Sequence, residues 1–272
     1  MFLCDERYSE KLRAASDYVK EKGYYPVFIS IHGSQNYQLD IYTKEYQSDF
    51  DYECVVLPRL EELVKQTKPV STVYDYQGGH IGVKDIRFFA SDLVKANPTY
   101  LECLATPHRM TCDKGCQQIE EMADLLDDLV TEAGSQFVMA CQGMFRERIR
   151  KMLNVSPATQ KNIESYGYDG KSASHLYRMT VMLRTFITTG KMQLIPSEQD
   201  KAIMMQLKLH KYPLDEVLNM SLAWENEVEQ MVWHYKETEP NPCYNVRNKI
   251  KSLSCDAVYI FCCSSEGRKK SD

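Results

Sequence analysis

The spacing of apolar residues in the first third of the chain changes repeatedly between the helical and the strand period. Helical spacing predicts three helices, and alternation or short apolar runs predict four strands. The predicted helices cover residues 9–21, 60–66 and 85–96, and the predicted strands cover residues 27–31, 50–57, 71–76 and 80–83. The last two strands predict a hairpin that turns at Gly78-Gly79. Strands interleaved with helices favour a mixed sheet flanked by helices.

From about residue 115 onward the pattern is helical only. Segments with helical spacing are separated by loops that contain Gly or Pro. The predicted helices cover residues 119–131, 136–153, 172–189, 197–210 and 214–235. The sequence therefore predicts an α+β chain with a mixed-sheet domain over residues 1–112, an all-helical domain over residues 113–262 and a frayed tail over residues 263–272.

Composition excludes some classes of protein without naming a substrate. Among 272 residues, 43% are hydrophobic and 26% are charged, which is typical of a globular protein. Lys plus Arg total 33 against 38 for Asp plus Glu, so a broad basic surface that coats nucleic acid is disfavoured, whereas a local basic pocket is not. No run approaches the roughly 18 apolar residues of a membrane-spanning helix, and the first residues lack the apolar core of a signal peptide. We therefore expect no membrane contact and a cytoplasmic location.

The ten cysteines suggest a disulfide framework or a zinc site, but their spacing favours neither. Cys112 and Cys116 form one pair and Cys262 and Cys263 are adjacent, and no second pair follows at the spacing of metal ligands. Without secretory features, we expect free and mostly buried thiols.

The most informative segment runs from residue 29 to residue 56. One β-rich run ends in His32-Gly33-Ser34, and Ser48-Asp49-Phe50-Asp51 leads into the next. Residues i and i+2 of a strand face the same side, so Asp49 and Asp51 project together. Two adjacent carboxylates favour a cation between them, and oxygen ligands suit Mg²⁺ or Mn²⁺, which take further ligands from substrate phosphates. Gly33 and Ser34 offer backbone N–H groups and a hydroxyl to such a phosphate.

A second metal ion that activates an attacking hydroxyl needs a third carboxylate, and Asp85 is the candidate. It comes just after the predicted strand over residues 80–83 and its run is expected beside the strand of Asp49 and Asp51. The alternative is that Asp85 is the N-cap of the helix that begins at Ile86, and this role is compatible with metal binding.

A basic helix face in the second half is a candidate phosphate site. Lys171, His175 and Arg178 are spaced i, i+4 and i+7, so one face of a helix carries all three. Lys as a point charge and Arg as a bidentate fork suit the β- and γ-phosphates of a triphosphate. The alternative is a solvated basic face that pairs with Glu164 or Asp169.

Other candidates are less specific. A second basic group consists of Arg146, Arg148, Arg150 and Lys151. We expect these residues to form a solvated helix face. If the acceptor is RNA or DNA, this helix is the first candidate for the contact with it. Tyr37 and Tyr52 flank the candidate site closely enough in sequence to contact a base or ribose. Glu102 either supports the site or contacts the acceptor, or else it is a capping or packing residue.

These residues resemble the signature of the DNA polymerase β-like nucleotidyltransferase superfamily, and more closely its bacterial and phage branch of predicted nucleotidyltransferases. The shared motifs are G-S-x-x-Y-x-L at residues 33–39, S-D-x-D-Y at 48–52, D-I-R at 85–87 and N-P-x-x-L-E-x-L at 97–104. The resemblance covers residues 27–105 well and extends more weakly to about residue 210. One departure is Gln38, where the family usually has glycine or another small residue.

The resemblance implies a metal-dependent transfer of a nucleoside monophosphate from a nucleoside triphosphate, with ATP the expected nucleotide, to an acceptor hydroxyl with release of pyrophosphate. It implies that Asp49 and Asp51 bind both Mg²⁺ or Mn²⁺ ions and that Asp85 binds the catalytic one. It also implies that Ser34 contacts the triphosphate and that the face of Lys171 and Arg178 approaches it. The acceptor is an RNA or tRNA end, a protein side chain or a small molecule.

The alternative function is a catalytically silent nucleotide-binding regulator, or an interaction protein of a toxin–antitoxin pair. The presence of Asp49, Asp51 and Asp85 argues against the loss of turnover. The sequence leaves the acceptor and the oligomeric state open.

Overall fold

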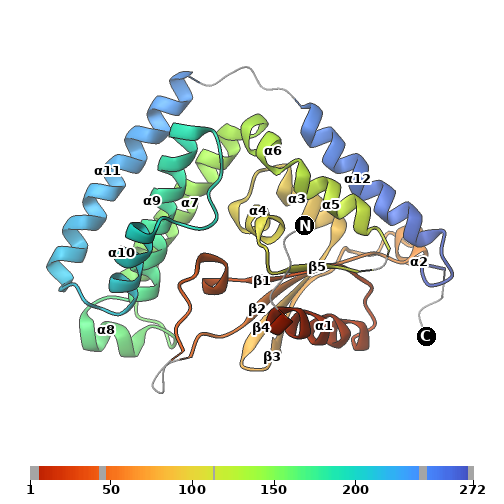
Figure 1. Cartoon of the computed structure of the whole chain (residues 1–272), viewed down its shortest axis with the longest axis horizontal. Helices are drawn as coiled ribbons and strands as arrows, with labels where there is room; N and C mark the ends of the chain where they lie inside the picture. The colour runs from red at the N-terminus through yellow and green to blue at the C-terminus, as the bar shows by residue number, and fades with distance from the viewer. Residues whose placement is uncertain (1–5, 43–46, 113, 239–243, 269–272) are drawn as a thin grey trace. The chain divides into compact units, whose positions relative to one another are not determined.

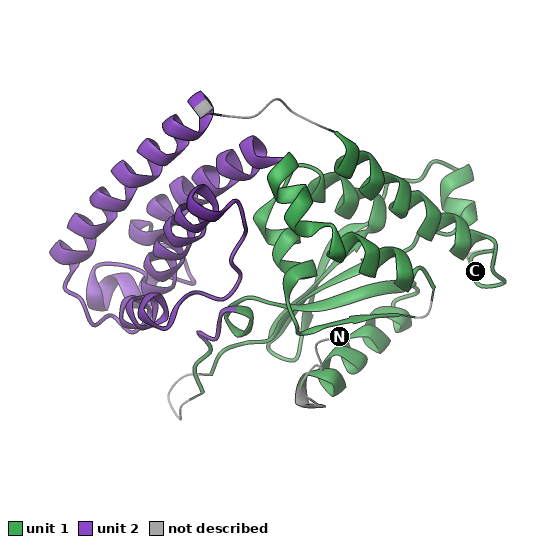
Figure 2. Cartoon of the chain, turned by 45° about the horizontal axis from the view of Figure 1, so that its top comes forward, with its two compact units in different colours: residues 1–36, 40–132, 242–272 green, residues 37–39, 133–241 purple. Residues whose placement is uncertain are grey.

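A computed structural model describes residues 6–42, 47–112, 114–238 and 244–268. The chain divides into two compact units (Figure 2). Unit 1 comprises residues 1–36, 40–132 and 242–272, and unit 2 comprises residues 37–39 and 133–241. The predicted division after residue 112 differs from this one, because residues 114–132 and the C-terminal segment belong with the sheet.

A five-stranded mixed sheet forms the centre of unit 1, in the order β3-β4-β2-β1-β5 (Figure 1). The strands are β1 Pro26–His32, β2 Asp51–Val56, β3 Ser71–Tyr76, β4 Gly79–Asp85 and β5 Arg109–Thr111. Strands β2 and β4 are parallel, whereas β1 is antiparallel to both β2 and β5, and β3 is antiparallel to β4. The predicted α+β class is confirmed. Strand β5 was not predicted, because three residues are too few for a recognisable alternation.

The hairpin of β3 and β4 turns one residue earlier than predicted. Tyr76 pairs with Gly79, so the two turn residues are Gln77 and Gly78. Both have positive φ, +48° and +84°, as a type I′ turn requires. Gly79 instead begins β4 and passes close to β2, since a Cβ there would lie 2.2 Å from the carbonyl oxygen of Phe50.

Helices cover both faces of the sheet in unit 1. They are α1 Glu6–Glu21, α2 Leu60–Val64, α3 Ile86–Leu93, α4 Pro98–Ala105, α5 Cys116–Asp124, α6 Leu126–Glu132 and α12 Asn245–Cys262. Helix α1 packs Leu12 and Val19 with residues of β1, β2 and β4 in one buried cluster. Phe89 of α3 meets Phe28 on the other face, with ring centroids 6.1 Å apart. Helix α12 packs on α5 and α3.

Two features of unit 1 depart from the predicted helices. The single helix expected over residues 119–131 is divided at Leu125 into α5 and α6. Helix α12 was not predicted, although Ile250, Leu253, Ala257 and Phe261 are buried at helical spacing. The apolar residues of α12 pack against α5, α3 and α6 of unit 1. This packing explains why the C-terminal segment is part of unit 1.

Unit 2 is helical, and α9 lies at its centre. Its helices are α7 Gly134–Leu153, α8 Gln160–Tyr166, α9 Gly170–Thr189, α10 Glu198–Lys208 and α11 Leu214–Thr238. Helix α9 packs against α7, α10 and α11. Asp169 caps its first turn by accepting a hydrogen bond from the N–H of Ser172, and Gly190 ends it with a φ of +73°. The predicted helices of this region are present, and the short α8 is an addition.

Residues 37–39 belong to unit 2 although the residues on either side of them belong to unit 1. The short 3₁₀ helix η1, Ser34–Tyr37, leads into them. Lys201 donates a hydrogen bond to the side-chain oxygen of Gln38 at 2.7 Å, and Lys208 donates to the carbonyl oxygen of Leu39 at 2.8 Å. Gln38 has a φ of +58°, so the residue that departs from the resembled motif also has an unusual backbone conformation.

The described cysteines are all free. Four of them are buried, namely Cys54, Cys103, Cys141 and Cys262. Cys112 and Cys116 are partly exposed, and Cys255 and Cys263 are exposed. Free thiols are therefore confirmed for these eight, whereas only half of them are buried. Cys4 and Cys243 lie outside the described residues.

The predicted frayed tail is folded as far as the structure describes it. Leu60 donates its N–H to the carbonyl oxygen of Gly267 at 3.1 Å, and Lys114 lies 3.7 Å from the carboxylate of Glu266. Residues 269–272 lie outside the described part. No helix that the structure describes combines the length and the apolar character needed to cross a lipid bilayer.

Candidate functional site

The loop after β1 and the start of β2 lie side by side in unit 1. His32 is opposite Asp51 in the antiparallel pair of β1 and β2, so the loop that contains Gly33 and Ser34 begins next to the paired aspartates. Gln35 donates a hydrogen bond from Nε2 to the carbonyl oxygen of Asp49 at 2.6 Å. The structure thus brings together the two segments that the sequence singled out.

The side chain of Asn36 holds the glycine–serine loop. Gly33 has a φ of +95°, and its carbonyl oxygen accepts a hydrogen bond from the N–H of Asn36 at 3.1 Å. Asn36 donates from Nδ2 to the carbonyl oxygen of Ile31 and accepts from the hydroxyl of Thr106, both at 2.8 Å. Ser34 follows at the start of η1 and is partly exposed. Asn36 was not among the predicted site residues, because it lies at a variable position of the resembled motif.

The two aspartates differ in their surroundings. Asp49 is exposed, whereas Asp51 is partly buried. The Oδ1 atom of Asp51 accepts a hydrogen bond from the N–H of His80 at 3.0 Å and lies 3.2 Å from Nδ1 of the same residue. His80 is therefore the β4 residue that lies beside the aspartate pair, because Tyr52 is opposite Ile81 in the parallel pair of β2 and β4.

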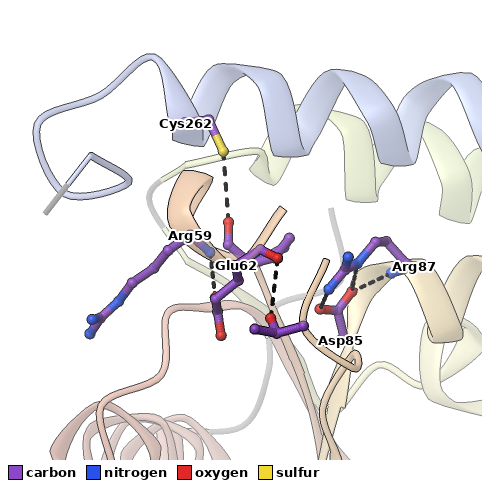
Figure 3. A network of polar contacts seen from close by, with 7 residues as sticks. Arg59, Glu62, Asp85, Arg87 and Cys262 are labelled. Carbon is purple, nitrogen blue, oxygen red and sulfur yellow. Dashed lines mark hydrogen bonds and ion pairs between the residues drawn. The ribbon is translucent and has the colours of Figure 1, made fainter. Parts of the chain in front are cut away.

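Asp85 does not lie with Asp49 and Asp51. It is opposite Val56, at the far end of the parallel pair, and is separated from His80 by about 16 Å along the strand. The buried carboxylate of Asp85 accepts hydrogen bonds from the N–H, Nε and Nη2 of Arg87 at 2.8, 2.8 and 2.7 Å (Figure 3). Asp85 is the N-cap of α3, which is the alternative role expected from the sequence. The expected grouping of three carboxylates is absent because the parallel register separates them.

A second carboxylate on the same face of β2 as Asp51 is Glu53. Gly82 lies opposite it on β4, and a Cβ on Gly82 would lie 2.2 Å from Oε2 of Glu53, so the glycine leaves room for this carboxylate. Burial raises the pKa of Glu53 to about 7, although the charge of Lys84 acts in the opposite direction. The i, i+2, i+4 spacing of Asp49, Asp51 and Glu53 is the sequence signal that identifies it.

The donor set allows a limited metal site. Within the described residues, no group of three or more His, Cys, Asp or Glu side chains is arranged to hold a metal ion. Asp49 and Asp51 nevertheless have the chemistry of a magnesium site in which substrate phosphates supply further ligands, since Mg²⁺ is commonly bound through one or two carboxylates. The pair therefore fits Mg²⁺ or Mn²⁺ that arrives with a phosphate ligand, and Asp85 does not fit as a third ligand.

The predicted basic face of α9 extends from the surface to the interior of unit 2. Lys171 is exposed, His175 is partly buried and Arg178 is 3% exposed. Arg178 Nη2 lies 3.0 Å from Nε2 of His175, and the guanidinium carbon lies 3.9 Å from the ring centroid of Tyr37. Tyr37, expected to contact a base or ribose, thus stacks on an arginine.

Two residues expected near the site are buried elsewhere in unit 1. Tyr52 is 3% exposed and belongs to the cluster beneath α1, on the opposite face of β2 from Asp51. Glu102 is 1% exposed within α4. A base or ribose contact by Tyr52 is therefore not supported, and burial of Glu102 favours its packing role.

Comparison with known proteins adds little to this geometry. No protein-family model and no curated protein matches the chain. Among solved structures, the chain is similar to a nucleotidyltransferase-like protein from Exiguobacterium sibiricum, with 10% identity, coverage of 92% of this chain and 88% of that one, and a TM-score of 0.31. A likeness of this strength gives no support for a shared site or activity, so a functional assignment depends on the residues themselves.

Proposed function

We propose that this chain is a nucleotidyltransferase that moves a nucleoside monophosphate from a nucleoside triphosphate, with ATP the expected donor, to an acceptor hydroxyl. The acceptor oxygen bonds to the α-phosphorus, the bond from that phosphorus to the bridging oxygen breaks, and pyrophosphate leaves with the electron pair. The hydroxyl proton passes to solvent. Candidate acceptors are an RNA or tRNA end, a protein side chain and a small molecule.

The observation that carries this proposal is the register of β1 and β2. With His32 opposite Asp51, the loop of Gly33 and Ser34 begins beside the carboxylate at the start of β2. The hydrogen bond from Gln35 to the carbonyl oxygen of Asp49 holds the two segments together. A phosphate-binding loop next to an aspartate pair is the minimum that phosphoryl transfer requires.

The residues of unit 1 bind and orient the nucleotide in this proposal. Gly33 lets the backbone approach a phosphate closely, and the hydroxyl of Ser34 donates to a phosphate oxygen. Asp49 and Asp51 would hold Mg²⁺ or Mn²⁺, and the ion would neutralise the negative charge that develops on the phosphates. His80 keeps the carboxylate of Asp51 in place through the hydrogen bond from its N–H. Catalysis then comes mainly from positioning and charge neutralisation.

A nucleotide-binding protein without turnover is the second candidate. The position of Asp85 favours it, because the third carboxylate expected of a two-metal site is paired with Arg87 at the far end of β4. The same loop and aspartate pair would then bind a nucleotide and leave it intact. Lys171, His175 and Arg178 of unit 2 are proposed phosphate ligands under both functions.

The test is incubation of the purified full-length protein with each α-³²P-labelled nucleoside triphosphate and Mg²⁺, with and without total RNA and cell lysate. Label transferred to RNA, protein or a small product identifies the acceptor class. Asp49→Asn and Asp51→Asn are expected to abolish the transfer without loss of folded protein. Asp17→Asn, which neutralises an exposed carboxylate on α1, is the matched control and is expected to retain it.

The outcomes separate the two functions. Transfer that survives Asp51→Asn would contradict the proposed metal-binding pair. Nucleotide binding without transfer to any acceptor would favour the silent regulator. Absence of nucleotide binding would contradict both functions.

A further inference from the structure

A cavity of about 320 Å³ lies in unit 1, away from the candidate site. Its lining includes Pro26, where β1 begins, and Leu57, which follows the end of β2. The antiparallel register pairs Pro26 with Val56 at this end of the sheet and His32 with Asp51 at the other. The cavity is therefore separated from the aspartate pair by about 20 Å along β1.

Aromatic rings line part of this cavity, and they belong to Tyr24, Tyr25 and Phe261. The ring centroids of Tyr25 and Phe261 lie 4.8 Å apart, so the residue before β1 packs on the last turn of α12. The hydroxyl of Tyr24 lies within hydrogen-bond distance of the hydroxyl of Tyr74 on β3, at 3.1 Å. Rings that are held by such contacts suit a ligand with a planar part.

The described lining also has more positive than negative charge. It contains the cationic side chains of Lys20, Arg59 and Lys114 and one carboxylate, that of Glu266. Lys114 lies 3.7 Å from Glu266, and Lys20 lies 3.0 Å from Asp17, which is outside the cavity and 65% exposed. Exposed ion pairs of this kind are weak, so both lysines can contact another anion.

The guanidinium of Arg59 favours an anion most strongly. Within the described ranges no carboxylate lies at ion-pair distance from it, and its Nη2 donates to the carbonyl oxygen of Gly23 at 3.3 Å. Its carbon lies 5.2 Å from the ring centroid of Tyr25. Figure 3 shows the side chain extending away from Glu62, whose carboxylate accepts from the backbone N–H of Arg59 at 2.6 Å. Most of the five guanidinium donors are thus left for a ligand.

The basic group of α7 offers no comparable site. Arg146 lies 3.7 Å from Glu229, and Lys151 lies 2.5 Å from Glu147, so each has a carboxylate partner at the surface. Arg150 is exposed as well. These residues form the solvated helix face expected from the sequence.

We propose that the cavity in unit 1 binds a nucleoside monophosphate. Its phosphate contacts Arg59 and Lys114, and its base packs against the aromatic rings. A phosphate monoester carries a charge of about −1.5 to −2 at pH 7, which the cationic lining offsets, and a guanidinium binds two phosphate oxygens at once. The volume is near the lower limit of the roughly 300–1,000 Å³ of ligand pockets, which suits one base with one phosphate.

Binding in this cavity does not depend on the proposed function, because neither the aspartate pair nor the glycine–serine loop lines it. The first test is calorimetric titration of the full-length protein with AMP in the presence of EDTA at low ionic strength. We expect Arg59→Met to weaken binding about tenfold or more, because methionine keeps an apolar stem and loses the charge. Arg13→Met removes an exposed arginine of α1 outside the cavity and is expected to leave binding unchanged. Equal affinities of Arg59→Met and wild type would overturn the proposal.

The thiol of Cys112 reports directly on occupation of the cavity. Cys112 lines it and is partly exposed, whereas Cys255 is exposed on α12 outside it. AMP is expected to slow alkylation of Cys112 by iodoacetamide several-fold and to leave Cys255 unchanged, as measured by peptide mass spectrometry. This measurement uses the wild type, so it decides the proposal even if Arg59→Met does not fold. Alkylation of Cys112 at the same rate with and without saturating AMP would overturn it.

Fragments of the ligand separate the two parts of the site. Adenosine keeps the base without the phosphate, and ribose 5-phosphate keeps the phosphate without the base. Each is expected to bind about tenfold more weakly than AMP. Adenosine that binds as tightly as AMP would contradict the role of the cations, and ribose 5-phosphate that does so would contradict the role of the rings.

Binding of AMP at the aspartate pair would give a different pattern. Asp51→Asn is expected to keep both AMP binding in EDTA and the protection of Cys112. Binding that is lost in Asp51→Asn and kept in Arg59→Met would overturn the cavity as the binding site.

Discussion

At the scale of single residues, the role of a carboxylate depends on what already contacts it. Asp49 is exposed, and Asp51 accepts a single backbone hydrogen bond from His80, so both have oxygen atoms left for a ligand. Asp85 accepts three hydrogen bonds from Arg87 and caps a helix. Aspartate is therefore proposed to serve binding at one end of the sheet, whereas at the other end it caps a helix.

Substitution of Asp85 is expected to affect stability rather than turnover. Asp85→Ala removes an N-cap, which costs about 1–2 kcal/mol, and leaves Arg87 without its partner. Asp85→Asn keeps an oxygen that can accept from the N–H of Arg87 and is expected to cost less. Urea unfolding gives the free energy, and initial rates of nucleotidyl transfer are compared per folded molecule. Loss of nucleotidyl transfer in Asp85→Asn at an unchanged free energy of unfolding would contradict this expectation and would indicate a catalytic role for Asp85.

The charge state of His210 is expected to make stability depend on pH. Its Nε2 accepts a hydrogen bond from the N–H of Gly170 at 3.1 Å, and its ring stacks on Tyr166. Burial lowers the pKa of His210, although Asp169 opposes this. As the pH falls, His210 therefore gains its proton in the unfolded chain before it does so in the folded protein. The contribution of neutral His210 to the free energy of unfolding is complete above the unfolded pKa of about 6.5 and is lost as the pH falls below it.

His210→Asn is the variant that tests this dependence. Asparagine tolerates the positive φ of +54° at this position and does not titrate. Between about pH 7.5 and pH 5.5, the free energy of unfolding is expected to fall more in the wild type than in His210→Asn. His234→Asn, which removes an exposed histidine of α11, is expected to keep the wild-type dependence. An identical fall in His210→Asn and the wild type would contradict the assignment.

At the scale of elements, the pairing of strands decides which residues meet. The parallel register of β2 and β4 brings His80 beside Asp51 and takes Asp85 to Val56. The close approach that permits this pairing depends on Gly79 at the start of β4. Strand register therefore controls the composition of the candidate site.

Gly79→Ala is expected to disturb this approach. The added Cβ would lie 2.2 Å from a backbone oxygen, so the strands must shift, at a cost of about 1–3 kcal/mol. Gly143→Ala is the matched control, because nothing lies within 4 Å of a Cβ there and it lies inside α7. That control is expected to stabilise by about 0.5–1 kcal/mol. Chemical unfolding of both variants measures the difference, and equal effects would contradict the close approach.

At the scale of the whole molecule, unit 1 is assembled from distant parts of the chain. The carboxylate of Glu132, the last residue of α6, accepts hydrogen bonds from the N–H groups of Val246 and Arg247 at 2.8 and 3.0 Å. These N–H groups belong to the first turn of α12, where a negative charge is stabilising. The C-terminal helix is thus fixed at its beginning by a residue more than a hundred positions earlier.

Helix α12 is expected to contribute to the stability of unit 1. Leu253 is 2% exposed, and Leu253→Ala is expected to cost about 2–5 kcal/mol. Leu222→Ala in α11 is the matched control, because Leu222 is 59% exposed and its loss should cost little. Hydrogen exchange at the amides of β1 and β2 is expected to accelerate in Leu253→Ala. Unchanged exchange there would contradict the inclusion of α12 in unit 1.

The sequence by itself determined the local elements of this protein. Apolar spacing is a property of neighbouring residues, so α1, α9 and the strands β1 to β4 were predicted within a few residues. Alternation also predicted that Asp49 and Asp51 share a face, because residues two apart in a strand do. The structure begins β2 at Asp51, so Asp49 lies before the strand. The cap at Asp85 followed from short-range chemistry in the same way.

Only the tertiary structure decided how these elements pair and divide. The register of β2 against β4 and the membership of α12 in unit 1 involve residues far apart in the chain. No local pattern encodes such pairings, since the free energy that selects them comes from burial and hydrogen bonds formed only after the chain has folded. For this reason the sequence identified the aspartate pair, whereas the neighbour of Asp51 on β4 was known only from the tertiary structure. That neighbour is His80 and not the predicted Asp85.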